Sequence, residues 1–440
     1  MANNRIARDM LERHKQVIAG GIVSLNRRID PLRVFVRAKG AYLWDIEGRQ
    51  YIDYHAAFSP HLLGHNDPDV NSAVVKTLEE ETSLMGAGTT PWEGELAQLI
   101  VECIPSLDQV QITNSGSEAT FHALRIAHAA TGREELVIMQ GGYNGWHNEV
   151  AFNLMDPFDR MSSWKPGDEL GLNPISAGIP KCIKDLVHVV QFNDLDAVEN
   201  LLKGRKIACI ITEPILQNIG VVKPKPGYLD GLRELCDSYG TLLIFDEVKT
   251  GFRSALGGYQ SICGVQADLS TFGKAVANGY PLGIIGGKKE YMGFFDHQDP
   301  SKKVMIAGTY NAHPIPVAAA IATLRKLMSR QEEIYAHLER LGEKMEAGLK
   351  TVFGAAGIPA TIVRQGSAFV VYFMNKAPES WLEIARDNDM ERDLQYRQLL
   401  VEKGIFHFPL QTKQGSISFA HTIEDIDKTL NITEGVVSKL

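Results

Sequence analysis

The middle of this 440-residue chain alternates short, continuously apolar runs with longer amphipathic segments. The runs include IACIIT at 207–212 and TLLIF at 241–245. Strands that are apolar on both sides are typical of parallel sheets covered by helices on both faces. We therefore expect an α/β protein with a largely parallel sheet. The expected strands are 109–113, 136–139, 207–212, 241–246 and 282–286, and the expected helices include 118–130, 229–239 and 312–328.

The two ends of the chain have a different pattern. Residues 41–53 are typical of a hairpin, and a long charged helix is expected over 331–352. Further expected elements are strands at 361–363, 368–373, 405–408 and 416–419 and helices at 389–403 and 423–437. We expect a small α+β domain built from both termini. The predicted boundaries are 1–60 for the N-terminal segment, 61–325 for the large domain and 326–440 for the C-terminal part.

Composition and motifs exclude several classes of protein. The net charge is −8 with no dominant basic patch, so we expect no nucleic-acid partner. No apolar run approaches the roughly 18 residues of a membrane span, and the first residues do not resemble a secretory signal. The five cysteines form no CxxC pair, which favours a cytoplasmic protein without disulfides. His61 and His65 lie in a loop-like segment, so we expect no metal site. Dinucleotide-binding, P-loop and GxSxG motifs are absent.

Three segments at strand-to-loop or loop-to-helix junctions carry groups suited to chemistry. Asn114-Ser115-Gly116-Ser117-Glu118 opens a helix, where free backbone N–H groups and hydroxyls suit a phosphate, although a plain serine cap is the alternative. Asp246 ends an apolar strand, where burial is costly unless the carboxylate meets a cation such as a protonated pyridine nitrogen, a metal or an arginine. A simple cap of the strand end is the alternative. Lys274 lies among small apolar residues, so it is either a Schiff-base nucleophile or a lysine that extends to solvent.

A fourth junction, the glycine-rich segment 141–147, offers an aromatic surface. Tyr143 can stack on a flat heteroaromatic ring or simply pack within its loop. Together the four junctions supply a phosphate cradle, a ring stack, a carboxylate and an amine. These are the groups that hold pyridoxal phosphate, which we therefore predict as the cofactor.

Five segments also resemble the signatures of one family. NSGSEA, ITEPILQNIG, LLIFDEVKTGFR, TFGKAVANGYPLG and AGTYNAHP are similar, in that order, to class III pyridoxal-phosphate aminotransferases. The resemblance runs from about residue 22 to the C-terminus, and the subgroup it most resembles is typified by glutamate-1-semialdehyde 2,1-aminomutase. It implies fold type I, the aspartate aminotransferase-like fold, with a mostly parallel seven-stranded-type sheet.

The resemblance also implies residue roles. Lys274 would form the Schiff base and later move a proton, and Asp246 would keep the pyridine nitrogen protonated. Val248 and Tyr143 would lie on the two ring faces. The remaining implied residues are Ser115, Gly116 and Ser117 at the phosphate, Asn218 near the phenolic oxygen, Glu213 as an acid behind the site, and Arg27 at a substrate carboxylate, with the adjacent Arg28 as the other candidate.

Gly308 and Thr309 would reach the phosphate from the partner subunit, so a homodimer is expected. The chain differs from the aminomutase subgroup at Tyr143-Asn144-Gly145, where Tyr-His-Gly is usual, and at Thr412-Lys413-Gln414-Gly415, where Phe-Glu-Ala-Gly is frequent. The function we predict is transamination between a small-molecule amino donor, an amino acid, and a keto or aldehyde acceptor. The alternatives are the aminomutase reaction, racemisation or decarboxylation on the same scaffold, and a non-catalytic dimeric binding protein. Residues 153–180 are expected to form a lid or active-site loop.

Overall fold

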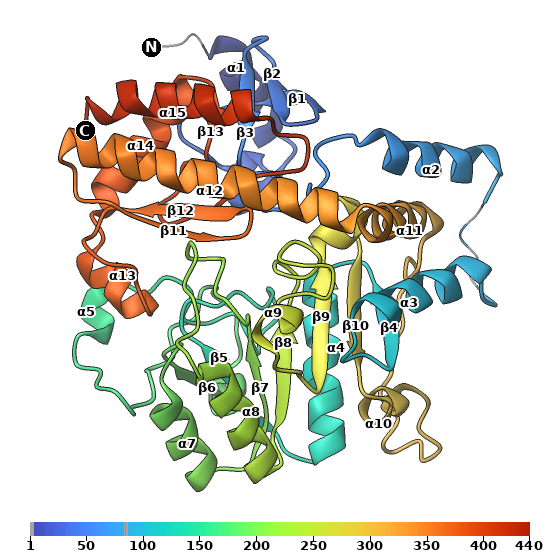
Figure 1. The fold of residues 1–440 in the computed structure, drawn as a ribbon. Helices are drawn as coiled ribbons and strands as arrows, with labels where there is room; N and C mark the ends of the chain where they lie inside the picture. Colours follow the sequence, from blue (N-terminus) through green and yellow to red (C-terminus); the bar gives the residue numbers. More distant parts are fainter. Residues whose placement is uncertain (1–3, 83, 85–86) are drawn as a thin grey trace. The chain divides into compact units, whose positions relative to one another are not determined.

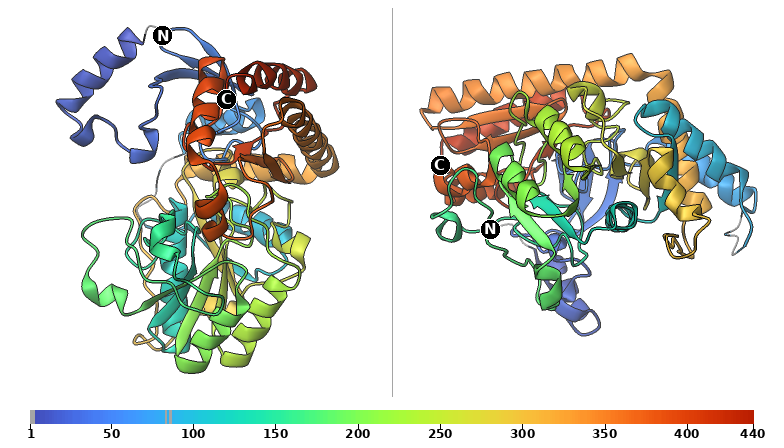
Figure 2. Two further views of the ribbon diagram at one scale, coloured as in Figure 1. Left: turned by 90° about the vertical axis from the view of Figure 1, so that its left-hand side faces the viewer. Right: turned by 90° about the horizontal axis from the view of Figure 1, so that it is seen from below.

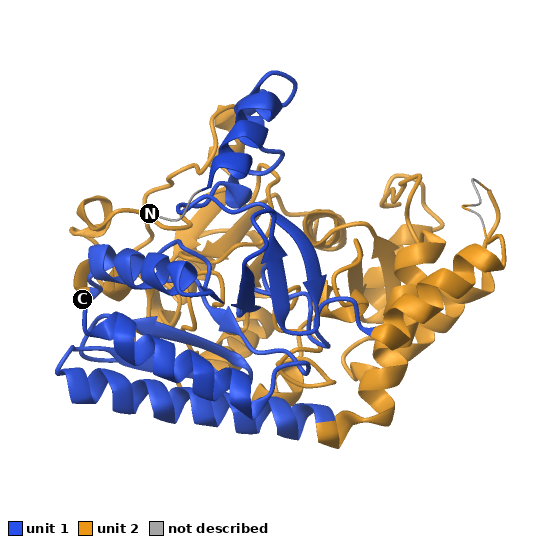
Figure 3. Cartoon of the chain, turned by 90° about the horizontal axis from the view of Figure 1, so that it is seen from above, with its two compact units in different colours: residues 1–67, 334–377, 388–440 blue, residues 68–333, 378–387 orange. Residues whose placement is uncertain are grey.

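A computed structural model of the chain describes residues 4–82, 84 and 87–440. The chain divides into two compact units (Figure 3). Residues 1–67, 334–377 and 388–440 form the first unit, and residues 68–333 and 378–387 form the second. Each unit is described below by itself.

The second unit is built on a seven-stranded sheet (Figure 1). All neighbouring strands are parallel except β10, which is antiparallel to both β4 and β9. The predicted α/β class with a mostly parallel sheet is therefore confirmed. In spatial order the strands are β4 (Gln109–Thr113), β10 (Gly283–Gly287), β9 (Leu269–Gly273), β8 (Leu242–Asp246), β7 (Ile207–Thr212), β5 (Glu135–Met139) and β6 (Val187–Val190).

Helices cover both faces of this sheet, as the apolar strands require (Figures 1 and 2). The chain crosses the sheet in one direction from β4 to β5 and in the opposite direction from β7 through β8 to β9. Because connections between parallel strands are right-handed, α4 lies on one face of the sheet and α7, α8 and α9 lie on the other. Every residue of β7, β8, β9 and β10 is buried. The helices of this unit are α2 (Pro68–Glu79), α3 (Pro91–Cys103), α4 (Gly116–Thr131), α5 (Phe158–Met161), α6 (Lys181–Lys184), α7 (Leu195–Gly204), α8 (Tyr228–Tyr239), α9 (Gln260–Cys263), α10 (Lys289–Met292), α11 (Pro314–Ser329) and α13 (Trp381–Asp387).

The first unit contains two small sheets. One has the order β1–β2–β3–β13 and the other the order β11–β12–β14. The strands are β1 (Phe35–Lys39), β2 (Tyr42–Asp45), β3 (Gln50–Asp53), β13 (Ile405–Phe406), β11 (Thr361–Gln365), β12 (Ala368–Tyr372) and β14 (Gly415–Ser416). The helices are α1 (Arg5–Lys15), α14 (Met390–Glu402) and α15 (Ile423–Val437), and α12 (Gln331–Ala356) enters this unit at Ile334.

Two strands of the large sheet, β6 and β9, were not expected from the sequence. β9 (LSTFG) mixes hydroxyl side chains with apolar ones, and β6 (VHVV) is short and carries a histidine. The segment 153–180 contains the short helix α5, and its Leu170 N–H donates to the Val189 carbonyl of edge strand β6 at 2.8 Å. This segment therefore lies over the exposed edge of the sheet.

One close approach fixes the sheet where β4 and β9 end. Gly283 begins β10 between Thr113 and Gly273, and a Cβ at Gly283 would lie 2.1 Å from the Ser115 carbonyl oxygen. Only glycine allows the backbone of the 114–118 segment to lie this close to β10.

Replacing Gly283 with alanine is expected to destabilise the second unit by about 1–3 kcal/mol or more, because backbone atoms must move to admit the methyl group. Thermal unfolding followed by circular dichroism measures this effect. Gly204→Ala is the matched control, since a Cβ at Gly204 meets nothing within 4 Å. Equal unfolding midpoints for the two variants would contradict the prediction.

Candidate active site

The chemistry-bearing residues of the second unit gather where the parallel strands end. Ser115 follows β4, Tyr143 follows β5, Glu213 follows β7, Asp246 ends β8 and Lys274 follows β9. Ligands of open α/β sheets bind beyond this edge. We call these residues and the loops that carry them the carboxyl-edge site.

Asp246 is a buried carboxylate with three hydrogen-bond donors. It receives Asn144 Nδ2 at 2.9 Å, the Val248 backbone N–H at 3.0 Å and the Thr271 hydroxyl at 3.2 Å. Burial raises the pKa of Asp246, while these donors and the charge of Lys274 act in the opposite direction. The carboxylate is thus fixed in place and suited to a cationic partner.

Lys274 lies one residue beyond β9 in a strained backbone conformation. Its φ of 47° is in the left-handed region, which is uncommon for a residue with a side chain. Burial lowers the pKa of Lys274, and the charges of Asp246 and Glu213 oppose that effect. A lowered pKa makes the neutral, nucleophilic amine more accessible.

The N-terminus of α4 forms the third part of the site. The Ser115 hydroxyl oxygen accepts the Glu118 N–H at 3.3 Å and caps the helix. The first N–H groups of a helix have no partner within it, so Gly116 and Ser117 offer donors to an anion. A Cβ at Gly116 would lie 2.7 Å from Val248 Cγ1, so this loop passes directly against Val248.

The Glu213 side chain is hydrogen-bonded to the backbone of Tyr143. Glu213 is buried and accepts the N–H groups of Tyr143 and Gln217, each at 3.0 Å. Burial and the nearby charge of Asp246 raise the pKa of Glu213 to about 7. Burial also raises the pKa of Tyr143, whose side chain is 37% exposed. Asn218 lies in the same loop after β7.

These residues fit pyridoxal phosphate. The α4 N-terminus offers N–H donors to a phosphate. The buried Asp246 offers a carboxylate to a protonated ring nitrogen, and Lys274 offers an amine to an aldehyde carbon. Val248 lies against the loop of Gly116, where it would offer an apolar face to a flat ring. The fit rests on a buried acid, Asp246, and an amine whose pKa is lowered by burial, Lys274, at the ends of the neighbouring strands β8 and β9.

Sequence comparison identifies the family. The profile of class III aminotransferases matches residues 24–432, and the chain belongs to this family. It is an enzyme that depends on pyridoxal 5′-phosphate.

The relatives are named either as aminomutases or as transaminases. The chain is 35% identical to the glutamate-1-semialdehyde 2,1-aminomutase of Persephonella marina over 98% of both chains. It is 37% identical to that of Methanocaldococcus jannaschii, covering 99% of this chain and 98% of the relative. Among solved structures, an omega-transaminase from Sphaerobacter thermophilus superposes with a TM-score of 0.89 at 30% identity, covering 98% of this chain and 97% of the other. Such matches confirm the predicted fold type I.

Three predicted residues belong to other segments of the chain. Gly308 and Thr309 are exposed in the second unit, and the nearby Asn311 Oδ1 accepts Asn114 Nδ2 at 3.0 Å. Arg27 is exposed at the end of a short 3₁₀ helix in the first unit. Within the described ranges, no group of three or more metal-binding side chains is arranged to hold an ion. No helix in the described part is long and apolar enough to cross a membrane.

Two supporting residues were missed from the sequence. Asn144, which donates to Asp246, belongs to a loop that precedes it by about a hundred residues. Glu247 is fully buried and accepts the Tyr259 N–H at 2.6 Å and the Thr250 hydroxyl at 2.8 Å. The Asp-Glu pair at the end of β8 was the available signal, because adjacent strand residues point to opposite faces.

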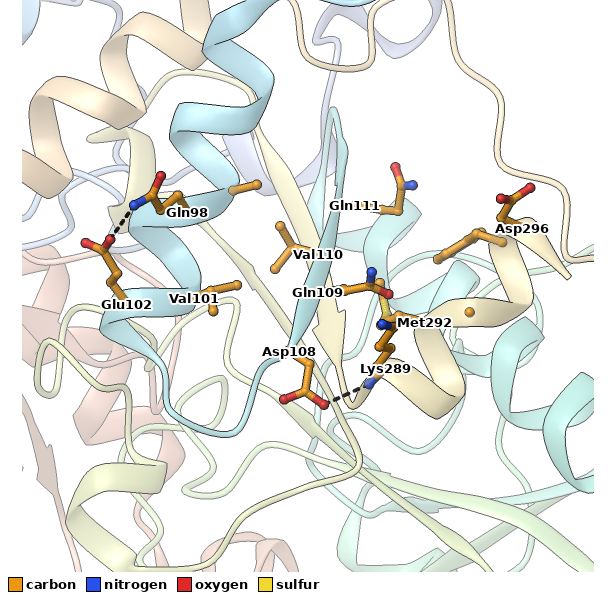
Figure 4. A pocket seen from close by; sticks show the side chains of 13 residues that line it. Gln98, Val101, Glu102, Asp108, Gln109, Val110, Gln111, Lys289, Met292 and Asp296 are labelled. Carbon is orange, nitrogen blue, oxygen red and sulfur yellow. Dashed lines mark hydrogen bonds between the residues drawn. The ribbon is translucent and has the colours of Figure 1, made fainter.

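A separate hollow lies at the amino end of β4 (Figure 4). It is lined by residues of α3, β4 and α10, and the Lys289 N–H donates to Asp108 there at 2.9 Å. It contains none of the predicted site residues. Its position at the opposite end of the strand separates it from the carboxyl-edge site.

Replacing Asn144 with alanine removes one donor from Asp246, so the pKa of that carboxyl should rise further. A hydrogen bond to a charged group contributes about 1.5–3 kcal/mol, so we expect amino transfer to slow by roughly 10–100-fold. The acidic limb of the pH–rate profile should move to higher pH. Asn148→Ala, an exposed neighbour, is the control. An unchanged acidic limb would contradict this role for Asn144.

The titration of Glu213 should also change how the free energy of unfolding depends on pH. Its pKa is raised, so the stability contributed by the protonated form is present below pH 4.5 and lost as the pH rises through about 7. At most about 3 kcal/mol is involved. Thermal unfolding of the cofactor-free protein between pH 5 and pH 8 should therefore show a smaller loss for Glu213→Gln than for the wild type. Parallel curves would rule out this titration.

Proposed function

We propose that this enzyme catalyses the reaction of its aminomutase relatives, moving an amino group between neighbouring carbons of glutamate-1-semialdehyde. The observation that supports it is the sequence identity of 34–37% to several aminomutases over nearly their whole length. These relatives favour this reaction over the two-substrate transamination that the sequence alone placed first.

The proposed roles follow from the carboxyl-edge site. When bound, pyridoxal phosphate supplies an electron sink that stabilises negative charge on the substrate carbon. Asp246 would keep the ring nitrogen protonated. The Lys274 amine would hold the cofactor's aldehyde carbon and, once released, would carry a second proton between the substrate carbon and the cofactor's C4′. The remaining assignments are the phosphate on Ser115, Gly116 and Ser117, the ring between Val248 and Tyr143, and the phenolic oxygen near Asn218.

Three further assignments belong to the same proposal. The active unit is a homodimer in which the exposed Gly308 and Thr309 reach the partner's phosphate. Arg27 binds a substrate carboxylate, for which a guanidinium offers paired donors. The enzyme works in the cytoplasm on small-molecule amino donors and acceptors.

Transamination between two substrates is the second candidate. Lys413 is buried where the aminomutase subgroup frequently has a glutamate, so the charge of that position is reversed. Asn144, which donates to Asp246, also replaces the usual histidine. The solved omega-transaminase, at 30% identity, is consistent with this reaction.

One assay separates the two reactions. The holoenzyme is given glutamate-1-semialdehyde alone, and 5-aminolevulinate is measured by chromatography. Steady formation without a second substrate supports the aminomutase. If none forms, the cofactor's absorbance is followed with a panel of amino acids and no acceptor. Conversion to the pyridoxamine form by one amino acid supports transamination by that donor, and no response to any substrate contradicts both reactions.

Replacing Lys274 with alanine should abolish turnover with either substrate set. Loss of the proton carrier alone costs about 10²–10⁴-fold, and the covalent link to the cofactor is lost as well. Lys203→Ala is the matched control, because Lys203 is exposed in the last turn of α7, where its Nζ pairs with Glu199 at 2.8 Å. Multiple turnovers by Lys274→Ala would overturn the assignment.

A further inference from the structure

The first unit contains an apolar hollow of about 630 Å³. Its walls come from the N-terminal segment, the first strands and the chain after β13. The apolar lining includes Met10, Leu11, Ile29, Phe35, Phe58 and Phe408. This volume lies within the range of small-molecule sites, which are mostly apolar with a few placed polar groups.

Arg33 is the unusual residue of this lining. It is only 6% exposed, and its one side-chain hydrogen bond in the described structure runs from Nη1 to the Leu32 carbonyl at 2.8 Å. Its Nε atom is buried and has no partner in the described structure. The guanidinium carbon lies 5.9 Å from the centre of the Tyr51 ring. No carboxylate among the described residues forms an ion pair with Arg33.

The nearby acids are already engaged. Asp53 lines the hollow, but its carboxylate accepts His65 Nε2 at 2.6 Å and the N–H groups of His55 and Ala56 at 2.8 and 3.0 Å. Asp45 accepts the Tyr51 hydroxyl at 2.8 Å and pairs with Arg49 Nε at 2.7 Å. Neither acid is therefore available to neutralise Arg33.

The other titratable groups of the lining are His14, His55, His65 and Arg27, none of which can supply a negative charge. A buried, unpaired guanidinium is costly, and arginine is rarely buried without a partner. An anion that enters the hollow would satisfy it. The apolar walls then select an anion attached to an apolar body.

We propose that this hollow binds a small molecule with an aromatic or branched apolar body and one carboxylate, which pairs with Arg33. Arg27 is exposed, whereas Arg33 is buried, so the two arginines are distinct positions for a carboxylate. The proposal concerns binding by the first unit, and Arg27, which the proposed function assigns to a substrate carboxylate, lines the same hollow.

Calorimetry on the holoenzyme tests it with 4-phenylbutanoate as the probe and 4-phenylbutanamide as the uncharged match. The carboxylate should bind at least tenfold more tightly than the amide. Arg33→Met should remove that difference, Arg33→Lys should retain part of it, and Arg27→Met should retain most of it. Equal binding of the two probes, or unchanged binding to Arg33→Met, would overturn the proposal.

A stability measurement separates binding from a structural role. Without ligand, Arg33→Met should unfold at the same temperature as the wild type or higher, because an unpaired buried charge is removed. A marked fall in its unfolding temperature would contradict the proposal. Competition with the amino substrate then identifies the natural source. Competitive inhibition by 4-phenylbutanoate supports a substrate carboxylate at Arg33, and binding without competition supports a separate regulatory carboxylate.

Discussion

Asp246 and Lys274 carry opposite charges at the ends of two adjacent parallel strands, where burial disfavours both charged forms. Parallel pairing of β8 with β9 places Asp246 opposite Thr271, three residues before Lys274. Each residue is stabilised by its surroundings, Asp246 by three donors and Lys274 by the neighbouring acids. This pair requires a rigid, fully buried sheet beneath it, which the strands β7, β8, β9 and β10 supply.

The same sheet edge brings the other groups of the site together. Gly283 allows β10 to pass close to Ser115, so the N-terminus of α4 lies beside the end of β9. The Glu213 carboxylate accepts the backbone N–H of Tyr143 and so fixes the loop that carries Tyr143. The groups proposed to hold the cofactor thus all belong to the second unit. The first unit carries the hollow, whose lining includes the exposed Arg27 and the buried Arg33.

Much of this arrangement could be predicted from local patterns. The continuous apolar runs predicted β7 and β8, and the helix-opening serines predicted the start of α4. Strand β9 was missed because Ser270 and Thr271 interrupt its apolar run, although both are buried. Asn144 was not identified as a partner of Asp246 because the two are 102 residues apart. Arg33 also has no local signal, since its burial depends on how distant segments pack around it.

The most direct test of this account locates the bond between protein and cofactor. The pyridoxal phosphate-loaded protein is reduced with borohydride, digested and examined by mass spectrometry. The account predicts one modified peptide, with the phosphopyridoxyl group on Lys274. Labelling of Lys249 or another lysine instead, or no labelling of a protein saturated with cofactor, would contradict it.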